Sequence, residues 1–170
     1  MSVEKKKGSW FFLKSRLRRP HRIGDRLEDN PGLEKLYRKA DDYMSRAKPF
    51  LCESFSLSDF AEGIYTNKTY LSRSINMGAH KGFRVYLNGY RVEHACALMN
   101  ENPRLTVKEV ALKSGFKNSV SFNDAFKKAK GMTPGTYLKN IKEEKGRSLS
   151  NSPEEDRQSS GPSSSQDGRN

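Results

Sequence analysis

The sequence predicts an all-α fold that contains two helix-turn-helix units joined by one long helix. The first observation is the stretch 106–137, TVKEVALKSGFKNSVSFNDAFKKAKGMTPGTY, in which apolar residues follow the helical period on both sides of a central glycine. The second is that the stretch 56–76 repeats this pattern about fifty residues earlier. The third is a continuous helical pattern over 82–101, between the two copies.

Residues 1–30 are predicted to form a basic, flexible N-terminal arm. They carry nine basic and four acidic side chains and one short apolar run, WFFL at 10–13. That run is far too short for a signal peptide or a membrane-spanning helix. Besides a solvated leader, two alternatives stay open: the arm lies on an anionic membrane surface, or it follows DNA phosphates.

The first helix is predicted over 31–47. Asn30 is a good N-cap, and Pro31 fits the first turn, where a missing N–H costs nothing. Lys48-Pro49 ends the helix, because the residue before a proline avoids the helical conformation. The apolar stripe that must pack on another element consists of Leu33, Leu36, Tyr37, Ala40, Tyr43, Met44 and Ala47.

Each helix-turn-helix unit is predicted to begin with a capping box. In such a box a hydroxyl accepts from the amide three residues on, and a carboxylate accepts from the amide of the capping residue. Thr106 pairs with Glu109 in the second unit, and Ser56 with Asp59 in the first. Gly115 ends the first helix of the second unit, since glycine tolerates positive φ. We expect the units to span about 56–77 and 106–130.

The helix over 82–101 is predicted to hold the two units at a fixed separation. Its length would be about 30 Å at 1.5 Å per residue. Thr133-Pro134 begins a last helix over 134–143. Residues 144–170 contain no aromatic side chain and are rich in Ser, which predicts a disordered tail. The predicted buried face of the long helix consists of Phe83, Leu87, Tyr90, His94, Ala97 and Leu98.

The net charge of +12 implies a partner with dense negative charge, either nucleic acid or an anionic membrane. Two cysteines are too few for a disulfide framework, which favours the reducing cytoplasm. The histidines and cysteines lack metal-ligand spacing, and no nucleophile-base pair, phosphate loop or dinucleotide motif occurs. We therefore expect no enzyme activity, no cofactor and no metal. The short stretch before the first helix cannot enclose a small-molecule pocket.

Four motifs, NKTYLSRSIN (67–76), YLNGYRVEHA (86–95), LTVKEVALKSGF (105–116) and FKKAKGMTPGTYLK (126–139), fall within the run 57–137. This run resembles the DNA-binding domain of the AraC/XylS family of bacterial transcription regulators. The resemblance implies a homeodomain-like fold of about seven helices and sequence-specific binding to double-stranded promoter DNA. It also implies a cytoplasmic protein, associated with the nucleoid, that activates transcription through contact with RNA polymerase.

Matched by position to the family, the outward residues of the two recognition helices form the expected DNA-binding site. We expect Arg73 to read a base, because its guanidinium can bond O6 and N7 of guanine together. The alternative is that it clamps a phosphate. The first set is Asn67, Lys68, Thr69, Ser72, Arg73 and Asn76, and the second is Lys117, Asn118, Ser119, Val120, Ser121, Asn123, Asp124 and Lys127.

The remaining side chains of these helices have other expected roles. Tyr70, Leu71 and Ile75 should point into the core. In the second helix Val120 can touch a thymine methyl group and Asn123 an adenine edge, whereas the serines serve equally well as phosphate contacts or caps. Lys117, Lys127 and Lys130 are expected to form a basic face near the phosphates.

Three residues depart from the family pattern. Asp124 places a carboxylate where DNA is expected, and it must accept from cytosine N4 or pair with Lys127 or Lys128 to avoid repulsion. Tyr65 and His80 stand where members usually have glycine, so strained backbone geometry is expected there. Two alternatives to a specific regulator follow: a non-specific basic DNA-binding protein, or a protein-interaction module with a degenerate second unit. The chain is either a short stand-alone member or the output end of a longer sensor.

Overall fold

The computed structural model describes residues 30–150 and contains only helices in that range. The predicted all-α class is therefore confirmed for the described part of the chain. The basic arm ahead of Asn30 and the predicted tail beyond residue 150 lie outside the described residues. The elements are α1 (Pro31–Ala47), the 3₁₀ turn η3 (Pro49–Leu51), α2 (Leu57–Gly63), α3 (Lys68–Ala79), α4 (Phe83–Glu101), α5 (Val107–Lys113), α6 (Ser119–Lys130) and α7 (Pro134–Ser150).

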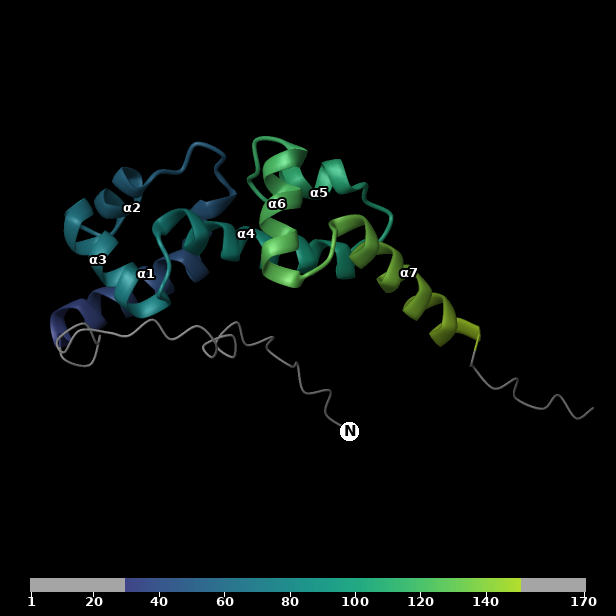
Figure 1. Cartoon of the computed structure of the whole chain (residues 1–170), viewed down its shortest axis with the longest axis horizontal. Coiled ribbons are helices and arrows are strands. Elements are labelled where there is room, and N and C mark those ends of the chain that lie inside the picture. The colour runs from purple at the N-terminus through teal and green to yellow at the C-terminus, as the bar shows by residue number, and fades with distance from the viewer. Residues whose placement is uncertain (1–29, 151–170) are drawn as a thin grey trace, which may run out of the picture.

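The helices form two lobes that share α4 (Figure 1). In Figure 1, α1, α2 and α3 lie on one side, α5, α6 and α7 lie on the other, and α4 runs between them. Each lobe has its own core of buried apolar side chains. Phe60 and Tyr86 are the largest fully buried side chains of the first core, and Phe122 and Phe126 are those of the second. Each helix-turn-helix unit is thus built around its own aromatic centre.

The expected single buried face of α4 is wrong. Tyr86 and Leu87 enter the first core, whereas Val92, Ala95 and Met99 enter the second. Ala97, which was placed on the buried face, is exposed. Because the two halves of α4 serve cores on different sides, its apolar positions do not follow one stripe.

Both predicted capping boxes are present at the start of the two helix-turn-helix units. The Thr106 hydroxyl accepts from the Glu109 amide at 3.2 Å, and the Thr106 amide donates to the Glu109 carboxylate at 2.7 Å. Ser56 and Asp59 make the same two bonds, at 3.3 and 2.8 Å. These bonds begin α5 and α2 at fixed residues.

Replacing Glu109 with glutamine is expected to make folding less sensitive to acid. Hydrogen bonds from the Thr106 amide and hydroxyl lower the pKa of Glu109 from its ordinary value of 4.5. The carboxylate therefore stabilises the folded state above that pH, and this contribution is lost as the pH falls through the lower folded value. Glutamine accepts the same bonds at every pH. Urea midpoints should agree near pH 7, and the parent should lose more stability by about pH 3; equal losses would contradict this role of Glu109.

The last helix is longer than predicted. α7 was expected to end at 143 but continues to Ser150, so residues 144–150 are helical and not part of a disordered tail. Two contacts help to explain the extension: Lys139 pairs with Glu143 one turn later at 3.8 Å, and the Lys145 ammonium donates to the Asn100 carbonyl. Within residues 30–150 no helix is both long and apolar enough to cross a membrane.

Candidate nucleic-acid interface

The start of α3 is fixed by Asn67, the first residue of the predicted site. Its side-chain oxygen accepts a hydrogen bond from the Tyr70 amide at 2.9 Å, which satisfies one of the free amides of the first turn. The inward side of α3 is formed by Leu71, Ser74, Ile75 and Gly78, all of them buried. The opposite side of the helix is thereby turned to solvent.

Helix α1 holds α3 in place. The Ser74 hydroxyl, which is fully buried, donates to the Leu33 carbonyl at 2.8 Å. Gly78 lies directly against the ring of Tyr37, where an added Cβ would come within 2.5 Å of the ring. This close approach allows α1 to pack on the length of α3. The outward face of α3 therefore has a rigid support.

Most of the DNA-binding residues predicted for the first recognition helix are exposed in the structure. Ser72 is half-buried. A shallow depression on this side of α3 is lined by six residues, five of which belong to the predicted set. Lys68 and Arg73 give α3 two cations and no acidic residue. The exposed members are Asn67, Lys68, Thr69, Arg73 and Asn76.

The expected burial of Tyr70 is wrong. Its side chain is 56% exposed, whereas Leu71 and Ile75 are buried as expected. Tyr70 instead lines a groove beside the start of α1, together with Leu36 and Thr66. A phenol at the start of the recognition helix thus adds an exposed hydrogen-bonding group next to the predicted site.

The second recognition helix, α6, repeats this construction. The Asn118 side chain accepts from the Ser121 amide at 2.9 Å, and Phe122, Ala125 and Phe126 are buried beneath the helix. Val120 is 71% exposed and lies on the outward face of the helix. The structure exposes Lys117, Asn118, Val120, Asn123, Asp124 and Lys127, and it leaves Ser119 and Ser121 half-buried.

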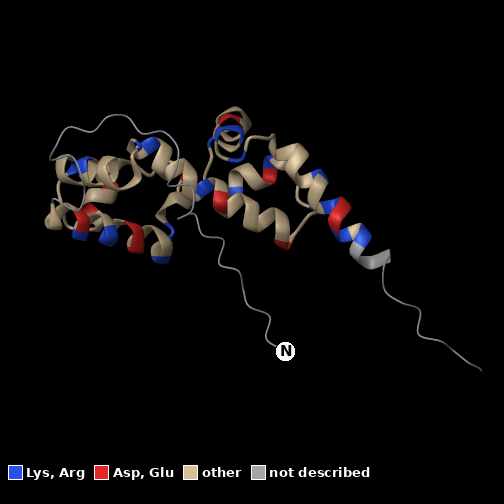
Figure 2. Cartoon of the chain, turned by 60° about the horizontal axis from the view of Figure 1, so that its bottom comes forward, with Lys and Arg blue, Asp and Glu red and all other residues tan. Residues whose placement is uncertain are grey.

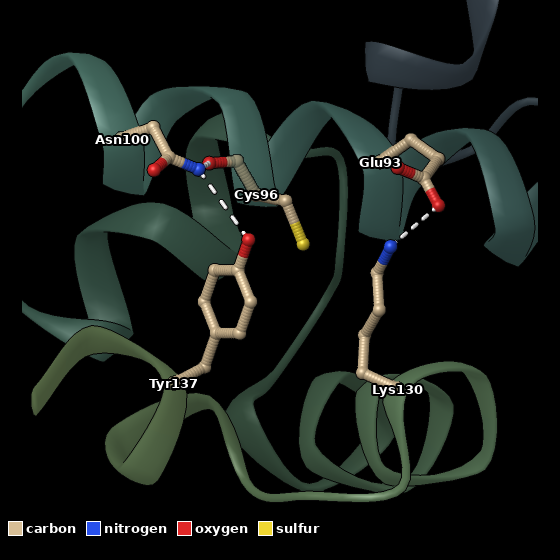
Figure 3. Close-up of polar contacts among 5 residues, drawn as sticks. All are labelled: Glu93, Cys96, Asn100, Lys130 and Tyr137. Carbon is tan, nitrogen blue, oxygen red and sulfur yellow. Dashed lines mark hydrogen bonds and ion pairs between the residues drawn. The ribbon is translucent and has the colours of Figure 1, made fainter. Parts of the chain in front are cut away.

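Lys130 does not join the predicted basic face. Its ammonium donates to the Glu93 carboxylate of α4 at 2.7 Å. Figure 3 shows this pair beside Cys96, with Tyr137 of α7 bonded to Asn100 of α4 at 3.4 Å. Burial lowers the pKa of Lys130, but the bond to Glu93 and the electrostatic interactions with Glu93, Cys96 and Tyr137 together outweigh it, so the net shift of the pKa is upward. Lys130 is therefore a tie between α6 and α4.

Comparison with known proteins agrees with this geometry. A family model described as "Helix-turn-helix domain" matches residues 60–140. The C-terminal domain of AraT, a response regulator from Geobacillus stearothermophilus, has a TM-score of 0.56 and 29% identity, and the match covers 64% of this chain and 88% of that one. A Chromobacterium violaceum transcriptional regulator with an AraC-type DNA-binding domain shares the fold at 18% identity, with a TM-score of 0.56 and coverage of 66% and 96%.

Residues 60–140 are a DNA-binding domain of the AraC/XylS family. The Melibiose operon regulatory protein of Escherichia coli is a curated relative, 27% identical over 106 residues. The match covers 60% of this chain and 35% of that protein, so the chain spans about a third of that relative's length. An AraC-type domain is a DNA-binding module of transcription regulators and not an enzyme. Among residues 30–150, no three His, Cys, Asp or Glu side chains gather to hold a metal ion.

Two residues of the AraC-type domain have a backbone conformation that is typical of glycine. Tyr65 and His80 adopt φ values of 53° and 54°, in the left-handed region that residues other than glycine rarely occupy. Both side chains are exposed, and the ammonium of Lys39 lies 6.0 Å from the ring centre of Tyr65. The positive φ expected at these two positions is therefore present.

Proposed function

We propose that the protein binds specific DNA sequences in the bacterial cytoplasm and regulates transcription, with α3 and α6 entering two adjacent segments of the major groove. The observation that carries the proposal is the repeated construction of α3 and α6. Each has 12 residues and an asparagine N-cap, and each keeps polar side chains on its outward face. Major-groove faces on one side of B-DNA recur about every 34 Å, a spacing that the shared helix α4 suits.

The side chains support a division of roles between the two helices. We assign base reading mainly to Arg73, at a guanine. Lys68, Lys117 and Lys127 would grip phosphates, which positions the helices without reading the sequence. On α6, Val120 suits a thymine methyl group, and Asn123 suits an adenine edge. The recognition helix α3 would therefore contribute more to sequence specificity than α6.

Selection of bound duplexes from a random DNA library, at about 150 mM salt, tests this function. We expect a two-part motif with centres about one helical turn apart, bound at least about 10³-fold more tightly than scrambled DNA. A motif of one half would mean that α6 only grips the backbone. Tight binding without any motif, with affinity falling by about 0.9 log units per log of salt for each phosphate contacted, would replace the regulator with a non-specific DNA-binding protein.

Asp124 favours one other function, that of a protein-interaction module in which α6 no longer binds DNA. The carboxylate is exposed, and no ion pair joins it to Lys127 or Lys128 in the described part of the chain. If α6 binds DNA, this negative charge lies near the phosphates without an ion pair to Lys127 or Lys128 that would neutralise it. The absence of DNA binding by the parent would turn attention to protein partners.

Replacing Asp124 with alanine is expected to tighten DNA binding, because the change removes repulsion from the phosphates. The gain should be about threefold to tenfold at low salt, equal for specific and scrambled DNA, and smaller at high salt. Titration of both duplexes at two salt concentrations measures it. Loss of preference at a single cytosine would instead show that Asp124 reads that base. Replacing Asp42 on α1 with alanine removes the same charge away from α6 and is the control.

We further propose that the protein activates transcription through contact with RNA polymerase. Support comes from the family of its DNA-binding domain, in which such regulators occur. A reporter gene placed behind the selected site should be expressed more strongly in the presence of the protein. Lower expression would make the protein a repressor and leave its DNA specificity intact.

A further inference from the structure

The side chain of Arg91 lies in the middle of α4, at the boundary between the two cores, and is only 8% exposed. Its Nε donates to the Phe50 carbonyl at 2.8 Å, and its Nη2 donates to the Cys52 carbonyl at 2.8 Å. These carbonyls belong to the segment between α1 and α2. A buried guanidinium that bonds two backbone carbonyls fixes that segment in both position and orientation, because its donors have a rigid planar arrangement.

The turn of the second helix-turn-helix unit meets the same place. The carbon at the centre of the Arg91 guanidinium lies 5.6 Å from the ring centre of Phe116, which is buried in the second core. Gly115, at φ 79°, lies so close to η3 that a Cβ atom would overlap the Phe50 carbonyl oxygen and lie 2.9 Å from the Leu51 carbonyl oxygen. The turn of the second unit therefore touches the segment between α1 and α2, which belongs to the first lobe, and Arg91 lies beside this contact.

We propose that Phe50, Cys52, Arg91, Gly115 and Phe116 form a clasp that fixes the orientation of α6 relative to α3, and that this clasp makes the protein selective for the spacing between the two halves of its DNA site. The part about DNA rests on the proposed function. Arg91 acts here as a positioning residue. In contrast to Arg73, it contacts no base; it sets the distance and angle between the two helices that read bases.

The shared helix cannot supply this precision by itself. One added base pair moves a half-site by about 3.4 Å along the duplex and turns it by about 35°. Each unit packs on a different side of α4, so a small roll of one unit about the helix would accommodate such a turn. Contacts between the units away from the helix axis oppose that roll. The clasp supplies them.

The first experiment compares DNA sites that differ only in spacing. The selected duplex is lengthened or shortened by one base pair between its halves, and the affinity of the full chain is measured for each. We expect the affinity of the parent to fall at least about tenfold at either altered spacing, since α3 and α6 can no longer bind their two half-sites at the same time. Arg91→Met keeps about the same volume but removes the hydrogen-bond donors, and its affinity should fall less than about threefold when the spacing is changed. Arg91→Lys should show a fall between those of the parent and Arg91→Met.

The second experiment measures the orientation without DNA. Spin labels at Ser58→Cys on α2 and Lys108→Cys on α5, both at exposed positions, report the distance between the units in a Cys52→Ser background. The hydrogen bond from Arg91 to Cys52 is made to the backbone carbonyl, which Cys52→Ser keeps. The parent should give a narrow distance distribution, and Arg91→Met a broader one. Val92→Ala, in the second core beside Arg91, controls for loss of stability.

A broader distribution together with a flatter spacing profile, in Arg91→Met and not in Val92→Ala, supports the proposal. An unchanged distribution, or equal broadening in Val92→Ala, overturns the clasp. Broadening with an unchanged spacing profile overturns its role in DNA selection. If the parent selects no two-part site, the proposed function fails and the statement on spacing fails with it, while the distance distributions still decide whether Arg91 fixes the orientation.

Discussion

Replacing Gly115 with alanine is expected to lower the free energy of unfolding by about 3 kcal/mol. Two penalties combine at this position. The residue has φ 79°, a conformation that disfavours any side chain by about 1–2 kcal/mol. The new methyl group would also overlap the Phe50 carbonyl oxygen, and backbone cannot move aside as a flexible side chain does. Urea unfolding followed by circular dichroism measures the loss.

Gly131 offers a matched control for Gly115→Ala. It ends α6 with φ 74°, yet a Cβ atom there would meet nothing within 4 Å. Gly131→Ala should therefore cost only the conformational penalty of about 1–2 kcal/mol. The difference between the two variants reports the contact between the turn of the second unit and η3. Equal losses would mean that this contact relaxes at no cost.

Replacing Arg73 with alanine is expected to weaken binding to the selected DNA site by about 10- to 100-fold, with a much smaller effect on scrambled DNA. A guanidinium that bonds both guanine acceptors contributes about 1–3 kcal/mol of discrimination. Arg73 is exposed on α3 and makes no core contact, so the variant should unfold at the same urea concentration as the parent. Titration of specific and scrambled duplexes in parallel measures the loss of preference.

The alternative role of Arg73 gives a different result in the same titration. A phosphate clamp would weaken binding to every duplex alike and reduce the salt slope by about 1. Arg46→Ala removes the same charge from α1, where Arg46 pairs with Asp42 at 2.7 Å, and it controls for net charge alone. If the two variants lose equally on both duplexes, Arg73 reads no base.

The helix starts, and the stop before Gly115, were predictable because they depend on neighbours in the sequence, whereas the end of α7 depends on a contact with Asn100. A capping box needs two residues three apart, as in Thr106 and Glu109, and both predicted boxes are present. The same holds for Gly115, whose positive φ follows from its place at the end of α5. The burial of α4 was not predictable in this way, because one helix serves two cores and periodicity indicates only one face.

The outward faces of α3 and α6 could be assigned because their inward residues alternate with them at helical spacing. Tyr70 was misplaced, since an aromatic residue between polar ones is usually buried, and only the position of α1 decides otherwise. Lys130 and Arg91 were missed as structural residues. Their partners, Glu93 and the carbonyls of Phe50 and Cys52, lie 37 to 41 positions away. No local pattern marks such a pairing.

The packing of α1 on α3 has a consequence for anyone who transplants this domain into a fusion protein. A fragment trimmed to the residues that match the family begins after α1. It would leave the Ser74 hydroxyl without its acceptor on Leu33 and expose the surface around Gly78 that Tyr37 now covers. Such a fragment would be prone to aggregate. The smallest portable unit therefore begins at Asn30.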